Sequence, residues 1–276
     1  MKTKLFFIFL LSLSLKSICQ TSNDRDIGSI AVLIQTSVGS GSGFYIQDTS
    51  KHFVCLVTAC HVLIDQKQNI PYCDSILLIS YKKNSQKDNR DSFKISLFSA
   101  YKMGLFRYDI NKDVAVLIFS TVKNRVISYF PFVRKLTNTS TYINSIEITV
   151  GKKINELITM AHIYTIGYPK SLTLNINFDY NRPLIRGGII SGVDLIKNKI
   201  IIDCPTYQGN SGGMVFESEV TSDTIYLIGL VSQFVPFEEH WINEAYGYFN
   251  TNVYNSGYTV VVPFDAIKEQ LDLITK

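Results

Sequence analysis

The sequence predicts an all-β protein with a single helix at its C-terminus. Short runs rich in Val, Ile, Tyr and Phe recur along the chain, and Gly, Asn, Asp and Ser cluster between them. This pattern is typical of many short strands joined by turns. The runs fall into two sets on either side of a polar stretch, residues 122–142. Two sets of about six strands each predict two small β-barrels or sandwiches.

Most of the individual runs are about five to eight residues long, as strands in globular proteins are. The first set comprises Ile30–Ile34, Phe44–Ile46, Phe53–Thr58, Ile76–Tyr81, Phe93–Ser99 and Val114–Phe119. The second set comprises Ile146–Val150, Ile163–Ile166, Gly188–Val193, Lys199–Asp203, Met214–Phe216, Ile225–Ser232 and Tyr258–Val262.

The last segment carries the helical pattern. Pro263 and a capping Asp265 precede a stretch in which Ile267, Leu271 and Ile274 repeat at i, i+4 and i+7. We expect this apolar stripe to pack on a barrel. The predicted division is an N-terminal barrel of residues 27–121, a linker of residues 122–142, a C-terminal barrel of residues 143–263 and a helix of residues 264–276.

The first twenty residues have the features of a secretory signal peptide. Lys2 and Lys4 precede the mainly apolar run Leu5–Leu15, and Ser17 and Cys19 place small side chains before a cleavage point. The run is too short to cross a bilayer, which takes roughly 20 residues. We therefore predict a signal peptide over residues 1–20, a secreted or periplasmic protein and no membrane association after cleavage. Lipidation of Cys19 is the alternative.

Composition and charge exclude several classes of protein. With 46% apolar and 18% charged residues, the chain is too apolar to be disordered. Its formal net charge of +4 falls to +1 when the leader, with its three lysines, is removed. No Lys/Arg-rich block remains, so we do not expect nucleic acid as a partner.

Four cysteines remain in the mature chain: Cys55, Cys60, Cys73 and Cys204. An even number in a secreted protein is compatible with two disulfides, in any of three pairings, or with buried free thiols. Their spacing matches no zinc template. We therefore expect neither a metal nor a cofactor.

Three motifs carry residues suited to chemistry, and the first is Gly209-Asn210-Ser211-Gly212-Gly213, between a predicted strand and an apolar run. Glycines on both sides of a serine permit a tight turn that exposes the hydroxyl and directs successive backbone N–H groups at one point. The alternative is an ordinary glycine-rich loop.

The second motif places His61 at the end of the predicted strand Phe53–Thr58. Histidine is the usual base for a serine hydroxyl, since its ordinary pKa is ~6.5. A hydrogen-bonded structural histidine is the alternative.

The third motif places Asp113 immediately before the apolar run Val114–Phe119. A carboxylate at the mouth of a buried strand needs a specific partner. Asp109 competes for this role but lacks the apolar strand directly behind it, and a plain turn residue remains the alternative.

The order His61, Asp113, Ser211 is the chain order of the chymotrypsin triad. With Thr58–Val62, Gly167-Tyr168-Pro169 and Gly209–Gly213, the sequence resembles the trypsin-like (chymotrypsin-fold) serine peptidases, in particular bacterial secreted members of the Deg and glutamyl endopeptidase types. The resemblance runs from about Ile27 to the C-terminus. It implies two six-stranded antiparallel β-barrels with a C-terminal helix and a site in the cleft between the barrels.

The resemblance also implies the chemistry. Ser211 would attack the scissile carbonyl of a polypeptide, His61 would take and return the proton, and Asp113 would orient the imidazole. The backbone N–H groups of Gly209 and Ser211 would form the oxyanion hole. Too few residues follow Val262 for an appended PDZ domain, so we expect a monomer.

Further residues are expected to bind substrate by the same resemblance: Pro205, Thr206, Val231, Ser232 and Phe234. Pro205 stands where a basic-specific enzyme carries a carboxylate, and Val231 where the glutamyl-specific branch carries a histidine. We therefore predict a small or apolar residue before the scissile bond.

Two other functions compete with a serine endopeptidase. One is a secreted, non-catalytic binding module that keeps the peptidase fold. The other is an esterase of the α/β-hydrolase type, because Gly209–Gly213 also matches a nucleophile elbow and Asp223 and His240 follow it. That fold requires alternating strands and helices, which the sequence does not show.

Overall fold

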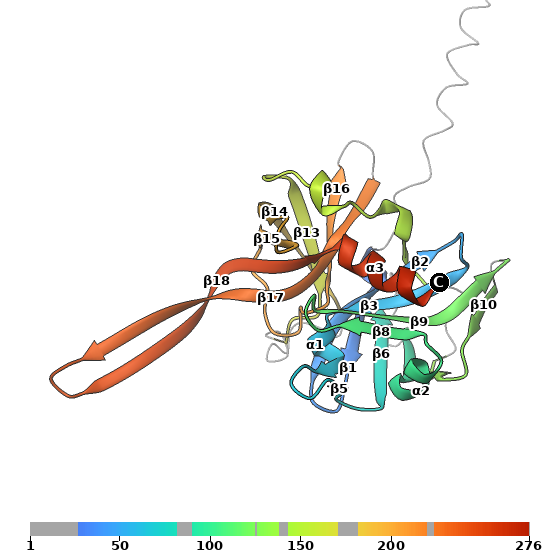
Figure 1. Ribbon diagram of the computed structural model, residues 1–276, viewed down its shortest axis with the longest axis horizontal. Helices are drawn as coiled ribbons and strands as arrows, with labels where there is room; N and C mark the ends of the chain where they lie inside the picture. Colours follow the sequence, from blue (N-terminus) through green and yellow to red (C-terminus); the bar gives the residue numbers. More distant parts are fainter. Residues whose placement is uncertain are drawn as a thin grey trace, which may run out of the picture.

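The computed structural model describes residues 27–81, 90–124, 126–137, 143–170, 182–219 and 224–275. The predicted signal peptide lies outside these ranges. Two β-sheet bodies lie side by side, and a long two-stranded ribbon projects from one of them (Figure 1). The all-β fold predicted from the sequence is confirmed.

The N-terminal body is a ten-stranded sheet whose main path runs β10-β9-β3-β2-β1-β6-β7-β11. The bounds of these strands are β1 Ala31–Gln35, β2 Ser40–Asp48, β3 Phe53–Thr58, β6 Ser75–Tyr81, β7 Arg90–Ser96, β9 Val114–Lys123, β10 Val126–Tyr129 and β11 Val133–Lys135. Off this path, β8 (Phe106–Asp109) pairs with β9 and β12 (Ile146–Glu147) pairs with β2 in parallel; β4 (Ile64–Asp65) and β5 (Ile70–Pro71) form a separate hairpin.

Short helical segments fill the connections of this body. Helix α1 (Cys60–Leu63) follows β3, and α2 (Leu97–Lys102) follows β7. Single 3₁₀ turns in the described residues include η1 (Ile27–Ile30), η2 (Ile148–Val150) and η3 (Ile154–Glu156). Ser96 ends β7 because its hydroxyl accepts a hydrogen bond from the backbone N–H of Ser99 and caps α2. The predicted strand over Phe93–Ser99 is therefore wrong in its last three residues.

The C-terminal body is a closed six-stranded antiparallel barrel in the order β13-β14-β15-β18-β17-β16. Its strands are β13 His162–Gly167, β14 Leu184–Asp194, β15 Lys199–Asp203, β16 Met214–Glu219, β17 Thr224–Asn243 and β18 Tyr248–Pro263. Isoleucine and valine side chains from most of these strands fill the interior; Ile190, Ile202 and Val261 are among those with no exposed surface. The six-strand prediction is confirmed here as a complete barrel.

A second apolar core joins the two bodies. It includes Val57 and Val116 from the N-terminal sheet and Met214, Leu230 and Val262 from the barrel. Helix α3 (Phe264–Ile274) leaves the barrel and packs against β8 and β9 of the N-terminal sheet (Figure 1). The apolar stripe predicted for this helix is buried at Ile267 and Leu271. The bodies therefore share one interface, and that interface carries the candidate site.

Two regions differ from the strand pattern in the sequence. The stretch expected to be a linker, residues 122–142, contains β10 and β11, which pair with β9 and β7 of the N-terminal sheet. In the second set, β17 and β18 continue far beyond Ile225–Ser232 and Tyr258–Val262 and pair with each other to Asn243 and Tyr248. Within the described residues, no helix is long and apolar enough to span a membrane.

Candidate active site

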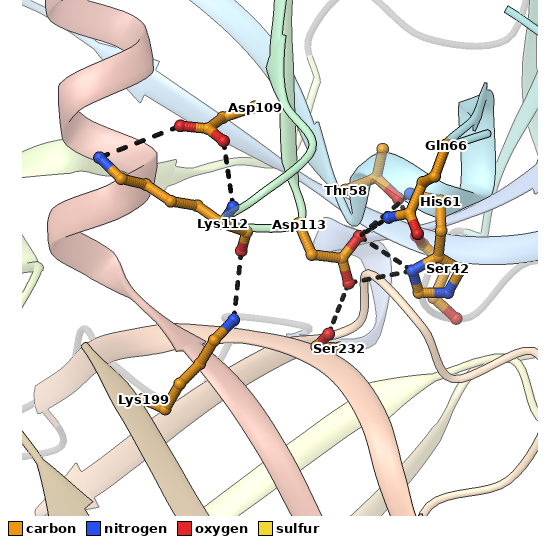
Figure 2. Close-up of polar contacts among 9 residues, drawn as sticks. All are labelled: Ser42, Thr58, His61, Gln66, Asp109, Lys112, Asp113, Lys199 and Ser232. Carbon is orange, nitrogen blue, oxygen red and sulfur yellow. Dashed lines mark hydrogen bonds and ion pairs between the residues drawn. The ribbon is translucent and has the colours of Figure 1, made fainter. Parts of the chain in front are cut away.

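His61 and Asp113 come together where α1 meets the turn before β9 (Figure 2). His61 Nδ1 lies 2.9 Å from Asp113 Oδ1 and 3.0 Å from Oδ2. The backbone N–H of His61 also donates to Oδ1, at 3.1 Å. Two contacts from one residue fix the carboxylate relative to the ring, and Figure 2 shows the second ring nitrogen pointing away from Asp113.

Asp113 is held in a backbone conformation that few residues adopt. Its φ is +59°, in the left-handed region, where Asn and Asp occur more often than other non-glycine residues. The turn is closed by its N–H, which donates to the carbonyl of Ile110 at 3.3 Å. Left-handed backbone directly before a buried strand turns the side chain out of the sheet toward His61, and such strained residues cluster at functional sites.

Ser232 and Gln66 complete the surroundings of the carboxylate. The hydroxyl of Ser232 donates to Asp113 Oδ2, and Gln66 Nε2 donates to Oδ1 at 3.4 Å. Burial alone raises the pKa of Asp113, but its hydrogen bonds with His61 and Ser232 and its attraction to His61 hold that pKa below its usual value. Asp113 is therefore suited to remain ionised and to fix the orientation of the imidazole.

Ser211 lies in a loop that only glycines could form. Gly209 and Gly212 have φ of +96° and +82°. A Cβ on Gly209 would lie 2.3 Å from the carbonyl oxygen of Tyr168, and one on Gly212 would lie 2.2 Å from that of Ser42. Space and backbone conformation thus both require glycine at these two positions of the motif.

Ser42 ties this loop to the N-terminal sheet. Its hydroxyl donates to the carbonyl of Gly209 at 2.6 Å and accepts from the N–H of Tyr168 at 2.8 Å. Its own N–H donates to the carbonyl of Ser211 at 2.8 Å, and Thr58 Oγ1 donates to its carbonyl at 2.7 Å. Sequence reasoning gave Ser42 no role; the structure makes it the buried link that positions the serine loop against the strand preceding His61.

His61, Asp113 and Ser211 line one cavity of about 440 Å³ between the two bodies. No hydrogen bond joins Ser211 to His61 in the part of the chain that the structure describes. The backbone N–H groups of Gly209 and Ser211 likewise have no partner among the described residues, although each neighbouring N–H in the loop, of Asn210, Gly212 and Gly213, has one. Unpaired N–H groups at both predicted positions leave two donors for an anionic oxygen.

The expected substrate-binding residues divide into two groups. Thr206, Val231, Ser232 and Phe234 line the cavity. Pro205 is not among its lining residues; its carbonyl accepts from Arg186 Nη1 at 2.9 Å. The predicted preference for a small or apolar residue before the scissile bond stays a prediction.

The family comparison supports the reading of this geometry. The model of a trypsin-like peptidase domain matches residues 41–221, well over half of the chain and inclusive of every residue of the predicted triad. The chain belongs to the trypsin-like peptidase family. No curated protein sequence matches it. The α/β-hydrolase alternative is wrong, because both bodies consist of antiparallel ladders, apart from the two-residue strand β12, and in the described residues lack the alternation of strands and helices that the hydrolase fold requires.

Solved structures share the fold of this trypsin-like peptidase at low sequence identity. A Glu endopeptidase structure matches with a TM-score of 0.52 and 12% identity over 91% of this chain and 93% of the other. A thermostable serine protease, AL20, from an extremophilic microorganism matches with a TM-score of 0.50 and 13% identity over 88% and 95%. At these identities the similarity establishes the chymotrypsin-like architecture.

The other residues that the sequence offered as alternatives for the triad are Asp109, Asp223 and His240. Asp109 accepts a hydrogen bond from the backbone N–H of Lys112 at 3.0 Å and forms an ion pair with the Lys112 ammonium at 4.0 Å (Figure 2). Its carboxylate therefore stabilises the turn between β8 and β9. Asp223 lies outside the described residues, and His240 lies on the projecting ribbon, where Nδ1 is 3.1 Å from Thr251 Oγ1.

Cys55, Cys60, Cys73 and Cys204 are free thiols, and Cys73 alone among them is not fully buried. Cys60 directly precedes His61, but burial raises its thiol pKa to about 12, so it is a poor thiolate nucleophile. Within the described ranges, no group of three or more His, Cys, Asp or Glu side chains is arranged to hold a metal ion. The cavity also contains Lys199, at 3.5 Å from the carbonyl of Lys112, which sequence reasoning missed because nothing local marks it.

Proposed function

We propose that this chain is a secreted serine endopeptidase that hydrolyses peptide bonds through Ser211, His61 and Asp113. The observation that carries the proposal is the pair of contacts between His61 Nδ1 and the Asp113 carboxylate at the wall of the cavity that also contains Ser211. With Nδ1 engaged, the proton of a neutral imidazole resides there and Nε2 is left as the base.

The expected reaction proceeds through an acyl-enzyme. Ser211 Oγ attacks the carbonyl carbon while Nε2 of His61 takes its proton, and the carbonyl electron pair moves to the oxygen held by the N–H groups of Gly209 and Ser211. Collapse expels the amine, which leaves with the proton from His61. Water then adds with the same base, and the carboxylic acid departs. Asp113 stays ionised throughout and stabilises the imidazolium.

The competing proposal is a binding module that keeps the fold without turnover. Three features speak for turnover: the ionised Asp113 is paired, two N–H groups of the serine loop are unpaired, and the loop admits only glycine at Gly209 and Gly212. A module without catalysis would not need a strained Asp113 backbone that aims a carboxylate at a histidine.

The test is covalent labelling of the mature protein with a fluorophosphonate, together with hydrolysis of unfolded casein. We expect labelling of the wild type, none of Ser211→Ala, and at least about a 10³-fold loss of hydrolysis in that variant. Ser37→Ala, which removes an exposed hydroxyl that faces the carbonyl of Tyr72, is the matched control and should label like the wild type. Labelling of both Ser variants, or of no protein, would exclude the catalytic proposal.

A further inference from the structure

The ribbon formed by the outer parts of β17 and β18 has no counterpart in the pattern predicted from the sequence. We call residues 236–255 the arm; its ladder runs from the pair Pro236–Asn255 to the pair Asn243–Tyr248. Figure 1 shows the arm extending away from both bodies. A two-stranded hairpin alone is marginally stable in water, and this one is anchored to the barrel only at its inner end.

Large apolar side chains are exposed on both faces of the arm. Partners in an antiparallel ladder share a face and neighbours alternate, so Trp241 and Tyr248 lie on one face and Ile242 and Phe249 on the other. All four are well exposed, Trp241 at 59% and Phe249 at 67%. Contiguous exposed apolar surface of this kind marks an interaction site.

The charge of the arm is acidic. It contains Glu238, Glu239 and Glu244 and no Lys or Arg, whereas the mature chain as a whole is slightly basic. A partner rich in aromatic or aliphatic residues with interspersed Lys or Arg matches this surface in both apolar character and charge.

The arm is continuous with the wall of the candidate site. Its strand β17 lines the cavity from Val231 to Phe234 immediately before the arm begins. At the other strand of its base, Asn255 Nδ2 donates to the carbonyl of Thr206, a second lining residue, at 2.6 Å. Ser256 Oγ donates to the carbonyl of Val235, also at 2.6 Å. The base of the arm is thus built into the site.

One edge of β17 is open from the cavity to the tip. Strand β16 pairs with β17 up to Leu230, and the loop after Ser211 continues the contact only to Val231. Beyond that point, no strand of the described chain pairs with this edge of β17. The arm portion, Pro236–Asn243, spans about 27 Å at the rise of ~3.4 Å per residue of an antiparallel strand. An open edge is a template for an added strand.

We propose that the arm binds the part of a polypeptide substrate that precedes the scissile bond, as a third strand on β17. Antiparallel addition is the more favourable pairing, and β17 runs from the cavity outward, so the bound chain runs from the arm tip into the cavity. The preferred ligand is an unfolded segment that alternates aromatic with basic residues. This inference rests on the proposed peptidase function and extends it to residues far from the bond that is cleaved.

The distribution of side chains favours a polypeptide over a second copy or a lipid surface. Two acidic arms packed on each other would bring like charges together. Insertion of the tip into a bilayer would take Glu244 into the hydrocarbon, and it would leave Phe237 and Tyr254, which lie at the base and are exposed as well, in water. The acidic residues would also be repelled by an anionic headgroup layer.

The decisive experiment compares two quenched fluorescent peptides with the same cleavage site. One has two residues before the scissile bond, and the other has twelve that alternate Phe or Tyr with Lys. In the arm-shortened variant, Asn-Gly replaces residues 237–254 and closes Pro236 to Asn255 as a two-residue hairpin. For the wild type, we expect kcat/KM to be at least about tenfold higher for the long peptide than for the short one. Each cross-strand pair with the arm adds a small favourable free energy, and several pairs together give a factor of this size.

The arm-shortened variant should lose this advantage while it cleaves the short peptide at the wild-type rate. Trp241→Ala should lose part of the advantage, and Ile196→Ala, which removes a fully exposed apolar side chain from the β14–β15 turn, should lose none. An undiminished advantage in the arm-shortened variant would overturn the proposal.

The arm can also be tested without cleavage, because Trp241 is the only tryptophan of the chain. In Ser211→Ala, titration with the long peptide should shift its emission to shorter wavelength and the short peptide should not. An absent shift would overturn the proposal, as would the same shift with rising protein concentration alone or with phosphatidylcholine vesicles. If no peptide is cleaved by the wild type, the proposed function fails, and this titration still decides the role of the arm.

Discussion

The inner part of the β17–β18 hairpin, within the barrel, and its outer part, the arm, belong to one antiparallel ladder, but the inner part is buried and the outer part is exposed to solvent. Leu230, paired with Val262, and Val231, paired with Val261, are at most 1% exposed. Farther along the same strands, apolar side chains such as Trp241 and Phe249 are exposed to solvent. Backbone pairing is therefore common to both parts. Burial of the side chains depends on whether the barrel interior and the core that includes helix α3 cover the two faces of the hairpin.

This difference separates two tasks within one element. The inner part closes the barrel and holds Ser232 against Asp113, so it requires a fixed backbone. The outer part leaves its edges and faces open, which is what recognition of an extended chain requires. The two parts should therefore respond differently to equivalent substitutions.

The largest difference is expected for glycine substitutions. A Cβ on Gly229 would lie 2.0 Å from the carbonyl oxygen of Val262, at the inner end of the β17–β18 ladder. Because backbone must move to relieve this clash, Gly229→Ala should lower the free energy of unfolding by about 3 kcal/mol or more. Urea unfolding followed by circular dichroism measures the loss.

Gly247→Ala is the matched substitution in the outer part. Gly247 has a φ of +65° and open space around its Cβ position, so the expected cost is only about 1 kcal/mol of backbone strain, confined to the tip. Equal shifts of the unfolding midpoint in the two variants would contradict the division of the hairpin into a structural and an open part.

The contrast also explains which parts of the fold were predictable. Phe53–Thr58 is buried on both faces and is apolar almost throughout, whereas Lys199–Asp203 buries alternate residues but carries three consecutive isoleucines. The structure places strands over these same residues. The arm has no such signal, since nothing covers it and Pro236, paired glutamates and asparagines are typical of turns. Strands β10 and β11 escaped prediction because they are short, four and three residues long, and lie in a stretch that also contains Asn124, Pro131 and the polar residues 137–141.

The residues of the candidate site were also predictable from the sequence only in part. Glycine spacing marked Ser211, and an acid before an apolar strand marked Asp113, because these roles depend on local backbone. Ser42 acts through contacts with Gly209 and Tyr168, more than a hundred residues away in the chain. No local pattern records such a contact, so only the fold could show it.

A smaller effect is expected at the boundary between the two parts of the hairpin. Ser232→Ala removes a hydroxyl that donates to the buried Asp113 carboxylate. A hydrogen bond to a charged group contributes about 1.5–3 kcal/mol, so stability should fall by roughly that amount. Part of the loss should appear in kcat for a short peptide, because the imidazole is held less firmly.

Steady-state kinetics and urea unfolding of Ser232→Ala test this expectation together. Ser256→Ala, at the base of the arm, removes a hydroxyl bonded to the carbonyl of Val235 and controls for the loss of a hydroxyl that does not contact Asp113. An unchanged kcat in Ser232→Ala, with KM alone affected, would show that Ser232 contacts substrate and does not support Asp113.

The smallest expected effect concerns acid stability. The pKa of Asp113 is raised by burial but lowered further by its bonds with His61 and Ser232, so its net shift is downward in the folded protein. The unfolded chain binds a proton at this carboxyl at a higher pH, near the ordinary value of about 3.9. The stabilisation is therefore fully present above that pH and is lost as the pH falls through the lower folded value.

Asp113→Asn removes this contribution, so its free energy of unfolding should fall less steeply with decreasing pH below about 4 than that of the wild type. Urea unfolding at a series of pH values from about 2 to 6 measures the two slopes. Glu244→Gln removes a carboxylate at the exposed arm tip and controls for the change in net charge. Because every other carboxyl group is common to Asp113→Asn and the wild type, parallel curves would mean that the inner hairpin, through Ser232, does not hold Asp113 in its ionised form.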